Sequence, residues 1–187
     1  MTGKLIVLTG LDGSGTSSVA THLHSLDASS SVFNSISSPY TTVREQVDKV
    51  VGEVSLSAHY YFYLSAVIYS SVLAEHQLKY GNVYCVRHLI DTVISHRANG
   101  LDVHLEYETA FYRIRKPDLI LYLDLDEDVR QNRITKRGKG YLDKKLDNND
   151  FRAKFLAEFR ALSGHMVKIE VAHKSVAQVA QEIRRLI

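Results

Sequence analysis

Short apolar runs alternate along this chain with longer stretches of helical spacing, and this pattern predicts buried strands separated by helices. Four short runs are rich in apolar residues, at residues 5–8, 82–86, 117–124 and 167–171, and the first three have mostly consecutive apolar residues. Continuous rather than alternating apolar character is typical of strands in a parallel sheet that is covered on both faces. The chain is therefore expected to have an α/β fold, with a central parallel sheet in a three-layer α/β/α arrangement.

The stretches between these runs predict the helices. Residues 56–78 are apolar on most sides, which predicts one long helix that is buried on most sides, in part by a partner subunit. An earlier helix is predicted before it, and Gly52 is expected to end or bend that helix. Its apolar positions are Val43, Val47, Val50 and Val51. A closing amphipathic helix is marked by Val176, Val179, Ala180 and Ile183. The pattern assigns no element to the short segment 32–36.

Length, charge and cysteine content limit the class of protein. The 187 residues are most simply one domain, residues 1–187, with a formal charge of +2. This charge predicts no general attraction to nucleic acid polymers or to membranes, so anion binding has to be local. Cys85 is the single cysteine, which excludes an internal disulfide and suits a reducing compartment. With a polar residue directly after Met1 and no apolar run near the roughly 18 residues that span a bilayer, we expect a cytoplasmic protein.

A glycine-rich turn after the first strand carries the strongest chemical signal. Residues 10–18, GLDGSGTSS, match the phosphate-binding pattern G-x-x-x-x-G-K-[ST] at Gly10, Gly15 and Ser17. Glycines in such a turn let backbone N–H groups surround a phosphate at a helix N-terminus. A dinucleotide-binding turn is a weak alternative, because its spacing, G-x-G-x-x-G, is absent. The sequence predicts a P-loop NTPase-type phosphate site, built from Gly10, Gly13, Ser14, Gly15, Thr16, Ser17 and Ser18.

Thr16 stands where this pattern has its lysine. The lysine offsets charge as a phosphoryl group is transferred, whereas threonine offers one neutral hydrogen bond, so catalysis needs another cation. Arg133 and Arg137 are the candidates, because side chains four residues apart project from the same face of a helix. Glycines 138 and 140 follow them, and residues 133–147 are interpreted as a mobile lid. A solvated basic helix end is the alternative interpretation.

The carboxyl ends of parallel strands meet at one edge of a sheet, where ligands bind. The loops that follow Leu8, Val86 and Leu123 are therefore expected to lie on one face. Arg87 comes directly after the second of these strands, where an arginine could bind an acceptor phosphate with two hydrogen bonds.

These features together resemble the thymidylate kinase family of P-loop nucleoside monophosphate kinases, in order and over nearly the whole chain. Residues 117–124 are similar to the family's P-D-x-x-x-x-L-D strand, and residues 133–138, RITKRG, resemble its R-x-x-x-R-G lid. In members with no arginine in the glycine loop, the lid carries the catalytic arginine. The resemblance implies ATP and Mg²⁺ as cofactors, with Ser17 at the metal. It also implies dTMP or a related nucleotide as acceptor, and a homodimer.

The resemblance assigns an acceptor site as well. Asp12 is implied near the sugar of the acceptor, and Pro39 in a loop where a serine replaces the family's glutamate. In the substrate-binding helix, Leu64 takes the position of a phenylalanine that stacks on the base, and Ile68 that of an arginine. A shift by one residue offers Tyr63 as the stacking ring.

Residues 86–96 resemble the family's DRY…S…AYQ segment. Arg87 and the hydroxyl of Thr92 are retained, whereas Val86 replaces an aspartate and His96 a glutamine. His88 and His96 flank the loop after the second strand and are expected to line the acceptor pocket by analogy.

Three losses of charge, at Thr16, Ile68 and Val86, leave three hypotheses of function. The first is an active kinase that transfers the ATP γ-phosphate to a nucleotide with altered activity or specificity, with Arg133, Arg137 and Thr16 around the transferring group. The second is a nucleotide-binding pseudokinase that acts as a sensor or regulatory subunit. The third is a structural dimer that has lost its ligand.

Overall fold

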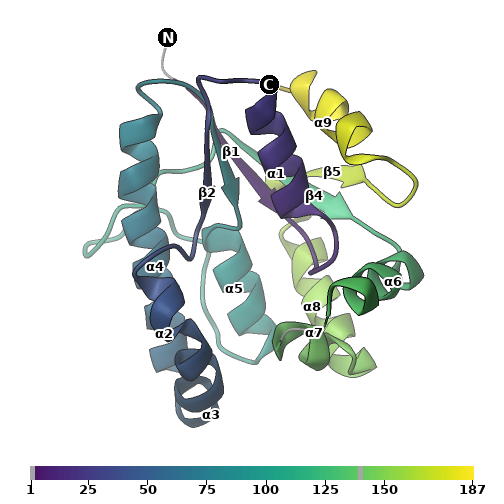
Figure 1. The fold of residues 1–187 in the computed structure, drawn as a ribbon. Helices are drawn as coiled ribbons and strands as arrows, with labels where there is room; N and C mark the ends of the chain where they lie inside the picture. The colour runs from purple at the N-terminus through teal and green to yellow at the C-terminus, as the bar shows by residue number, and fades with distance from the viewer. Residues whose placement is uncertain (1–2, 139–140) are drawn as a thin grey trace.

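The computed structural model describes residues 3–138 and 141–187. Within these residues, five strands form a parallel sheet in the order β2-β3-β1-β4-β5 (Figure 1). The strands are β1 (Leu5–Thr9), β2 (Ser31–Asn34), β3 (Val83–Val86), β4 (Leu119–Asp124) and β5 (Val167–Glu170). The predicted α/β fold with a central parallel sheet is confirmed.

The helices connect the strands in chain order. They are α1 (Thr16–Ser25), α2 (Tyr40–Gln46), α3 (Gly52–Val54), α4 (Leu56–Gln77), α5 (Leu89–Ala98), α6 (Glu127–Arg137), α7 (Tyr141–Leu146), α8 (Asn149–Ala161) and α9 (Val176–Arg184). A π-helical turn, η1 (Val47–Val51), joins α2 to α3, and a 3₁₀ turn, η2 (Ser163–His165), precedes β5. No helix in the described part of the chain is both long enough and apolar enough to cross a membrane.

The three layers follow from the alternation of side chains along the strands. In the central strand β1, Leu5 and Val7 pack toward α4, α5 and α8, whereas Ile6 and Leu8 pack toward α1 and α9. These helices lie on the two faces of the sheet (Figure 1). All four side chains are completely buried. A strand that is covered on both faces has no polar side, and this is why it reads as an apolar run.

Two parts of the fold depart from the sequence pattern. Strand β2 lies at the edge of the sheet and has only half-buried and exposed residues, so the segment 32–36 gives no continuous apolar run. Gly52 does not end its helix: its φ of −62° is helical, and the helix continues through Val54. The break comes at Ser55, whose hydroxyl accepts a hydrogen bond from the N–H of Ala58 and caps α4.

Helix α4 is buried on one side rather than on most sides of this chain. Tyr60, Leu64 and Val67 pack into the core beneath the sheet. Tyr61 is 65% exposed and Val72 61% exposed on the outer side. The apolar breadth of this helix therefore exceeds what the fold of one chain covers.

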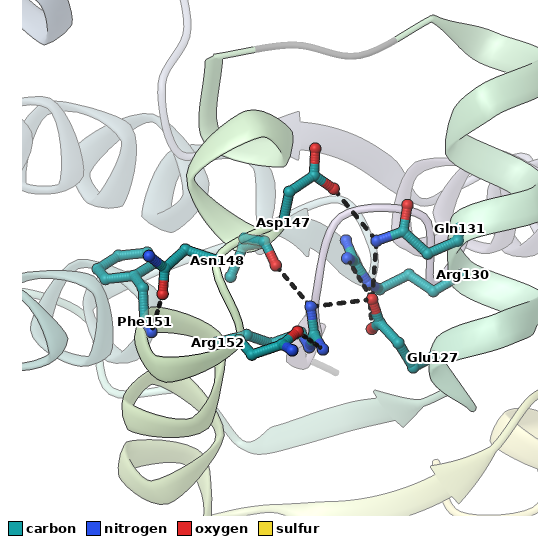
Figure 2. Close-up of polar contacts among 9 residues, drawn as sticks. Glu127, Arg130, Gln131, Asp147, Asn148, Phe151 and Arg152 are labelled. Atoms are coloured by element: carbon teal, nitrogen blue, oxygen red, sulfur yellow. Dashed lines mark hydrogen bonds and ion pairs between the residues drawn. The ribbon is translucent and has the colours of Figure 1, made fainter.

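A polar network holds α6 against α8 and the phosphate loop (Figure 2). The Glu127 carboxylate accepts hydrogen bonds from Arg130 Nε at 2.7 Å and from Gln131 Nε2 at 2.8 Å, and it forms an ion pair with Arg152 at 3.3 Å. The Arg130 side chain is completely buried and packs on Gly13, where an added Cβ would lie 3.2 Å from Arg130 Cγ. The first turns of α6 are thus fixed on the loop after β1.

Candidate active site

The phosphate loop and Arg87 meet because β1 and β3 are neighbours whose helices run to opposite faces of the sheet. Helix α1, after β1, packs on one face, and α5, after β3, packs on the other. In open α/β sheets such a divergence opens a crevice at the carboxyl ends of the strands. A cavity of about 850 Å³ occupies this position.

Most of the site residues predicted from the sequence line this cavity. They are Asp12, Gly13, Ser14, Gly15, Thr16, Ser17, Ser18, Tyr63, Arg87, Thr92, His96, Arg133 and Arg137. Gly10 is buried beneath the loop, and Pro39 is exposed at the start of α2. Leu64 is buried in the core, because it lies about 100° around α4 from Tyr63. Of the two alternatives for the stacking residue, the structure places Tyr63 on the cavity.

The glycines of the phosphate loop allow backbone conformations and close backbone contacts that a side chain would prevent. Gly13 and Gly15 both have a φ of 92°, which strongly favours glycine. A Cβ on Gly10 would lie 2.7 Å from the carbonyl oxygen of Leu123 in β4, too close for any side chain. A Cβ on Gly15 would meet only Arg133 Nη1, at 3.9 Å, so open space remains beside the first turn of α1.

The loop offers hydrogen-bond donors suited to an anionic oxygen ligand. Gly15 is the N-cap of α1 and has no side chain, so the first N–H groups of the helix lack an intrahelical partner and a side-chain cap. The Ser14 hydroxyl is buried and has no hydrogen-bond partner among the described residues. These groups fit a nucleotide phosphate.

The same turn fits the implied metal ion. The Ser17 side chain is exposed in the first turn of α1 and lines the cavity. Mg²⁺ takes hard oxygen ligands and is commonly bound through few protein groups together with substrate phosphates. Ser17 is therefore the residue that would hold it beside a bound nucleotide. The described residues contain no cluster of three or more His, Cys, Asp or Glu that could hold a metal.

Thr16 leaves the lysine position without charge, and an arginine from α6, Arg133, contacts the same loop. Arg133 Nη1 lies 3.4 Å from the carbonyl oxygen of Gly13, and its Nη2 lies 3.3 Å from that of Val171. Both distances are long for hydrogen bonds, so these contacts stabilise the guanidinium only weakly. Turning toward a phosphate would therefore lose little hydrogen-bond energy.

Arg137 lines the same cavity one turn further along α6. The helix ends after it at Gly138, whose φ of 92° suits a glycine that stops a helix. Gly140, which is expected to add mobility to a lid, lies outside the described residues, so the lid stays a prediction.

Arg87 forms ion pairs with two carboxylates, those of Asp12 and Asp91. Its Nη2 donates to Asp12 Oδ1 at 2.7 Å, and its Nη1 donates to Asp91 Oδ1 at 3.0 Å and to the carbonyl oxygen of Gly10. Burial disfavours the charged guanidinium, but Asp91 and Asp12 outweigh burial and raise the pKa of Arg87. Its φ of 70° is uncommon for a residue with a side chain, and such backbone conformations are often found at functional sites.

Asp91 is a cavity residue that sequence reasoning missed. Its Oδ1 accepts a hydrogen bond from Thr9 Oγ1 at 2.5 Å, and its Oδ2 accepts one from the His88 backbone N–H at 2.9 Å. It lies in the first turn of α5, where a carboxylate is favourable. A signal was present, since an aspartate four residues after Arg87 at the start of a helix is placed to pair with it.

The wall opposite the phosphate loop is a chain of hydrogen bonds. Tyr63 donates to Asp48 Oδ1 at 2.6 Å and accepts from Arg44 Nε at 3.1 Å. His59 joins Asp48 to His96, with Nε2 3.0 Å from Asp48 Oδ1 and Nδ1 2.8 Å from His96 Nε2. Burial raises the pKa of Tyr63 and opposes charge on Asp48, but hydrogen bonds from His59 and Tyr63 lower the pKa of Asp48.

Of this wall, sequence reasoning found Tyr63 and His96 but missed Arg44, Asp48 and His59. Burial lowers the pKa of His96 to about 4, and its Nδ1 lies 2.7 Å from the carbonyl oxygen of Thr92. No local motif marks the three missed residues.

His88 is not on the cavity, contrary to expectation. Its side chain is buried away from the residues that line the cavity, and it stacks on Tyr107 with ring centroids 6.2 Å apart. Neither ring nitrogen has a hydrogen-bond partner among the described residues. Burial lowers the pKa of His88 to about 4.

Lowering the pH from 7.5 to 5 is expected to remove about 2 kcal/mol of unfolding free energy through His88. The unfolded histidine binds a proton near pH 6.5, whereas the folded one does so near pH 4, so its contribution is complete above pH 6.5 and is lost as the pH falls toward 4. Urea unfolding at both pH values measures this loss. The variant His88→Phe keeps the ring and should show a smaller loss, whereas exposed His104→Gln should match the wild type. Equal losses in all three proteins would contradict the assignment.

Comparison with known families decides the relationship. The family model for thymidylate kinase matches residues 8–183. The chain belongs to the thymidylate kinase family. The match runs from the end of β1 through α9, and it confirms the resemblance found in the sequence. Comparison with curated proteins finds no match.

Solved structures share the fold of this thymidylate kinase family member. A thymidylate kinase from Candida albicans has a TM-score of 0.75 at 19% identity, with coverage of 100% of this chain and 91% of that one. A deoxyadenosine kinase from M. mycoides with bound dATP has a TM-score of 0.71 at 16% identity, covering 98% of each chain. A thymidylate kinase from Ehrlichia chaffeensis has a TM-score of 0.65 at 16% identity, covering 100% and 99%. At these identities the likeness shows the fold alone.

Proposed function

We propose that this protein is a nucleoside monophosphate kinase that transfers the γ-phosphate of ATP to dTMP or a related nucleotide, with altered activity or specificity. One observation carries the proposal: the phosphate loop and the Asp12–Arg87 pair open on the same cavity from two neighbouring strands. A donor phosphate and an acceptor bound there would lie side by side, as direct transfer requires.

The roles follow from the positions of the residues. The backbone N–H groups of the phosphate loop would hold the donor's phosphates, and Ser17 would hold Mg²⁺, which would supply positive charge to offset the phosphates. Arg133 and Arg137 cover the transferring group. Asp12 and Arg87 hold the acceptor, whose pocket is lined by Tyr63, Thr92 and His96.

A nucleotide-binding pseudokinase is the second candidate. The uncharged Thr16 and Val86 favour it, because both line the cavity and neither contributes the charge that the family resemblance implies there.

Isothermal titration with ADP and ATP in the presence of Mg²⁺, paired with an ATP-consumption assay on dTMP and related acceptors, separates these functions. Saturable ATP binding with turnover is expected. Binding without turnover on any acceptor favours the pseudokinase. If no nucleotide binds at millimolar concentration, the result favours the third hypothesis, a structural dimer that has lost its ligand.

Gly15→Val tests whether the nucleotide binds at the phosphate loop, and Gly164→Ala is its control. A side chain at that φ strains the loop and fills the space beside α1, so nucleotide binding should be lost. Gly164→Ala changes a glycine with nothing within 4 Å of its added Cβ and should bind as the wild type does.

The homodimer and the cytoplasmic location stay predictions. Tyr61, Tyr69 and Val72 on the outer side of α4 are the exposed apolar residues that support a dimer through this helix. Exposed apolar side chains on one face are typical of an interaction surface.

A further inference from the structure

Two histidines on the cavity wall make contacts that determine how many ring protons they share. His96 Nδ1 lies 2.7 Å from the carbonyl oxygen of Thr92, which can only accept, so this nitrogen carries a proton. His59 Nε2 lies 3.0 Å from the carboxylate oxygen Oδ1 of Asp48, so it carries a proton as well. Between the two rings, His59 Nδ1 and His96 Nε2 are 2.8 Å apart, and this hydrogen bond needs one further proton.

The three hydrogen bonds together need three protons on two rings. Two neutral histidines carry two protons, so the pair that makes all three bonds has one positive charge. Burial opposes charge on Asp48, but its hydrogen bonds and the charge of Arg44 lower its pKa, so an ionised carboxylate faces the pair. Burial lowers the pKa of His96 to about 4, which leaves His59, next to this carboxylate, as the ring that carries the charge.

The phenols that face the pair from α4 are neutral. The Tyr60 ring centroid lies 5.2 Å from that of His96, and the Tyr63 ring centroid lies 4.9 Å from that of His59. Burial raises the pKa of Tyr60 to about 12 and also raises the pKa of Tyr63. Among these groups, Asp48 is therefore the one whose negative charge stabilises the third proton.

The pair connects a poorly buried segment to the rest of the fold. Residues 40–54 form α2, η1 and α3, and this segment, which we call the arm, contains no buried residue along its described length. Asp48 of the arm contacts His59, and Arg44 of the arm lies 3.6 Å from the same carboxylate. The arm also comes close at Gly52, where an added Cβ would lie 3.1 Å from His59 Cδ2. A segment without a buried apolar face depends on such polar contacts for its position.

Loss of the third proton would break one of the three hydrogen bonds, because two nitrogen or oxygen lone pairs would then face each other. The bond between Asp48 and His59 joins the arm to α4, and the bond between the rings joins α4 to α5. Asp48, His59, Tyr63 and His96 all line the cavity. A change in the position of the arm would therefore change the shape of the proposed acceptor pocket.

We propose that His59 and His96 share three ring protons and that this positively charged pair positions the arm and Tyr63 for binding of the acceptor. His59 is thus a positioning residue, which acts through Asp48 and Tyr63. The acceptor should bind most tightly while the pair holds its third proton, and less tightly as the pH rises and this proton is lost. The role in acceptor binding rests on the proposed function, whereas the proton count does not.

The proton count is tested by ¹⁵N NMR of the histidine rings at pH 7, on the wild-type protein without nucleotide. The nitrogen shifts report which ring nitrogens carry a proton, and the signals that disappear in His59→Gln and in His96→Gln assign the pair. We expect three protons on its four nitrogens. Asp48→Asn removes the negative charge and should leave two protons. Two protons in the wild-type protein would overturn the proposal.

The positioning role is tested by the KM for dTMP, or for the best nucleotide acceptor, at pH 7 and pH 9 with ATP and Mg²⁺. The acceptor phosphate loses its second proton near pH 6, so its charge changes little over this range. The wild-type KM should rise about tenfold, with kcat changing less than about threefold, because a hydrogen bond to a charged group is lost. His59→Gln should have the raised KM at both pH values. His76→Gln, at an exposed position of the same helix, should behave as the wild type does.

The outcomes separate this inference from the proposed function. A KM that rises equally in wild type and in His59→Gln would overturn the positioning role, even if the pair holds three protons. Asp48→Asn lacks the same link and gives the same comparison if the thermal midpoint of His59→Gln shows that it does not fold. No turnover on any nucleotide would contradict the proposed function and the role in acceptor binding, but the ring spectra would still decide the proton count.

Discussion

Replacing Arg133 with alanine is expected to lower kcat by about 100- to 1,000-fold, the usual effect of removing one well-placed donor to a transition state. In the structure its guanidinium lies over the phosphate loop, 3.4 Å from the Gly13 carbonyl oxygen and close to the open side of Gly15. No lysine is present in the loop, and Arg133 is a cation that contacts the loop directly. Steady-state kinetics with ATP and the best acceptor measure the change.

The Arg133 prediction requires that the loss be catalytic rather than structural. Its two contacts are long and join backbone carbonyls, so thermal unfolding of Arg133→Ala should differ little from that of the wild type. Arg185→Ala, at the exposed end of α9, is the matched control and should keep wild-type turnover. Unchanged turnover in Arg133→Ala would show that Arg133 does not replace the missing loop lysine. Arg137 would then be the remaining candidate for that role.

Replacing Thr16 with lysine is expected to raise kcat by up to about 100-fold. Thr16 lines the cavity at the first position of α1, so a lysine there would extend toward the phosphates of the bound donor. A charge-assisted hydrogen bond is about twice as strong as a neutral one. The same substitution should restore most of the turnover lost in Arg133→Ala, because the two cations would serve the same phosphate.

The rescue distinguishes shared from separate roles. Thr16→Met adds a side chain of similar reach without charge, and it should neither raise turnover nor rescue Arg133→Ala. If Thr16→Lys raises kcat equally in the presence and absence of Arg133, the two positions act independently and the arginine does not stand in for the lysine. If Thr16→Lys leaves kcat unchanged in both proteins, the loop lysine is not what limits the rate.

Features with a local signal could be predicted from the sequence. The buried strands read as apolar runs because both of their faces are covered, and the phosphate loop could be found from the spacing of Gly10, Gly15 and Ser17 alone. The amphipathic helix α9 likewise buries Val179, Ala180 and Ile183, as its spacing indicates. Strand β2 could not be found in this way, because its two apolar residues, Val32 and Phe33, are flanked by polar ones. The other edge strand, β5, is also largely exposed but could be recognised from Val167, Ile169 and Val171.

The part of the cavity lined by Asp12, Arg87 and Asp91 depends on contacts between distant parts of the chain. Arg87 and Asp12 are 75 residues apart in sequence, and Thr9 and Asp91 are 82 apart. Nothing in the local pattern of residues 44–48 shows that α2 and η1 will place Arg44 and Asp48 against α4 and α5. The choice between Tyr63 and Leu64 was likewise open until packing buried one and left the other on the cavity.

By itself the sequence determined the layered α/β fold and a phosphate loop that lacks its lysine, because periodicity and glycine spacing are properties of short segments. Only the tertiary structure decided which charged side chains lie together on the cavity. Two strands that are neighbours in the sheet but distant in the chain bring Asp12, Arg87 and Asp91 together. The electrostatics of a site depend on distances between side chains, and folding sets those distances.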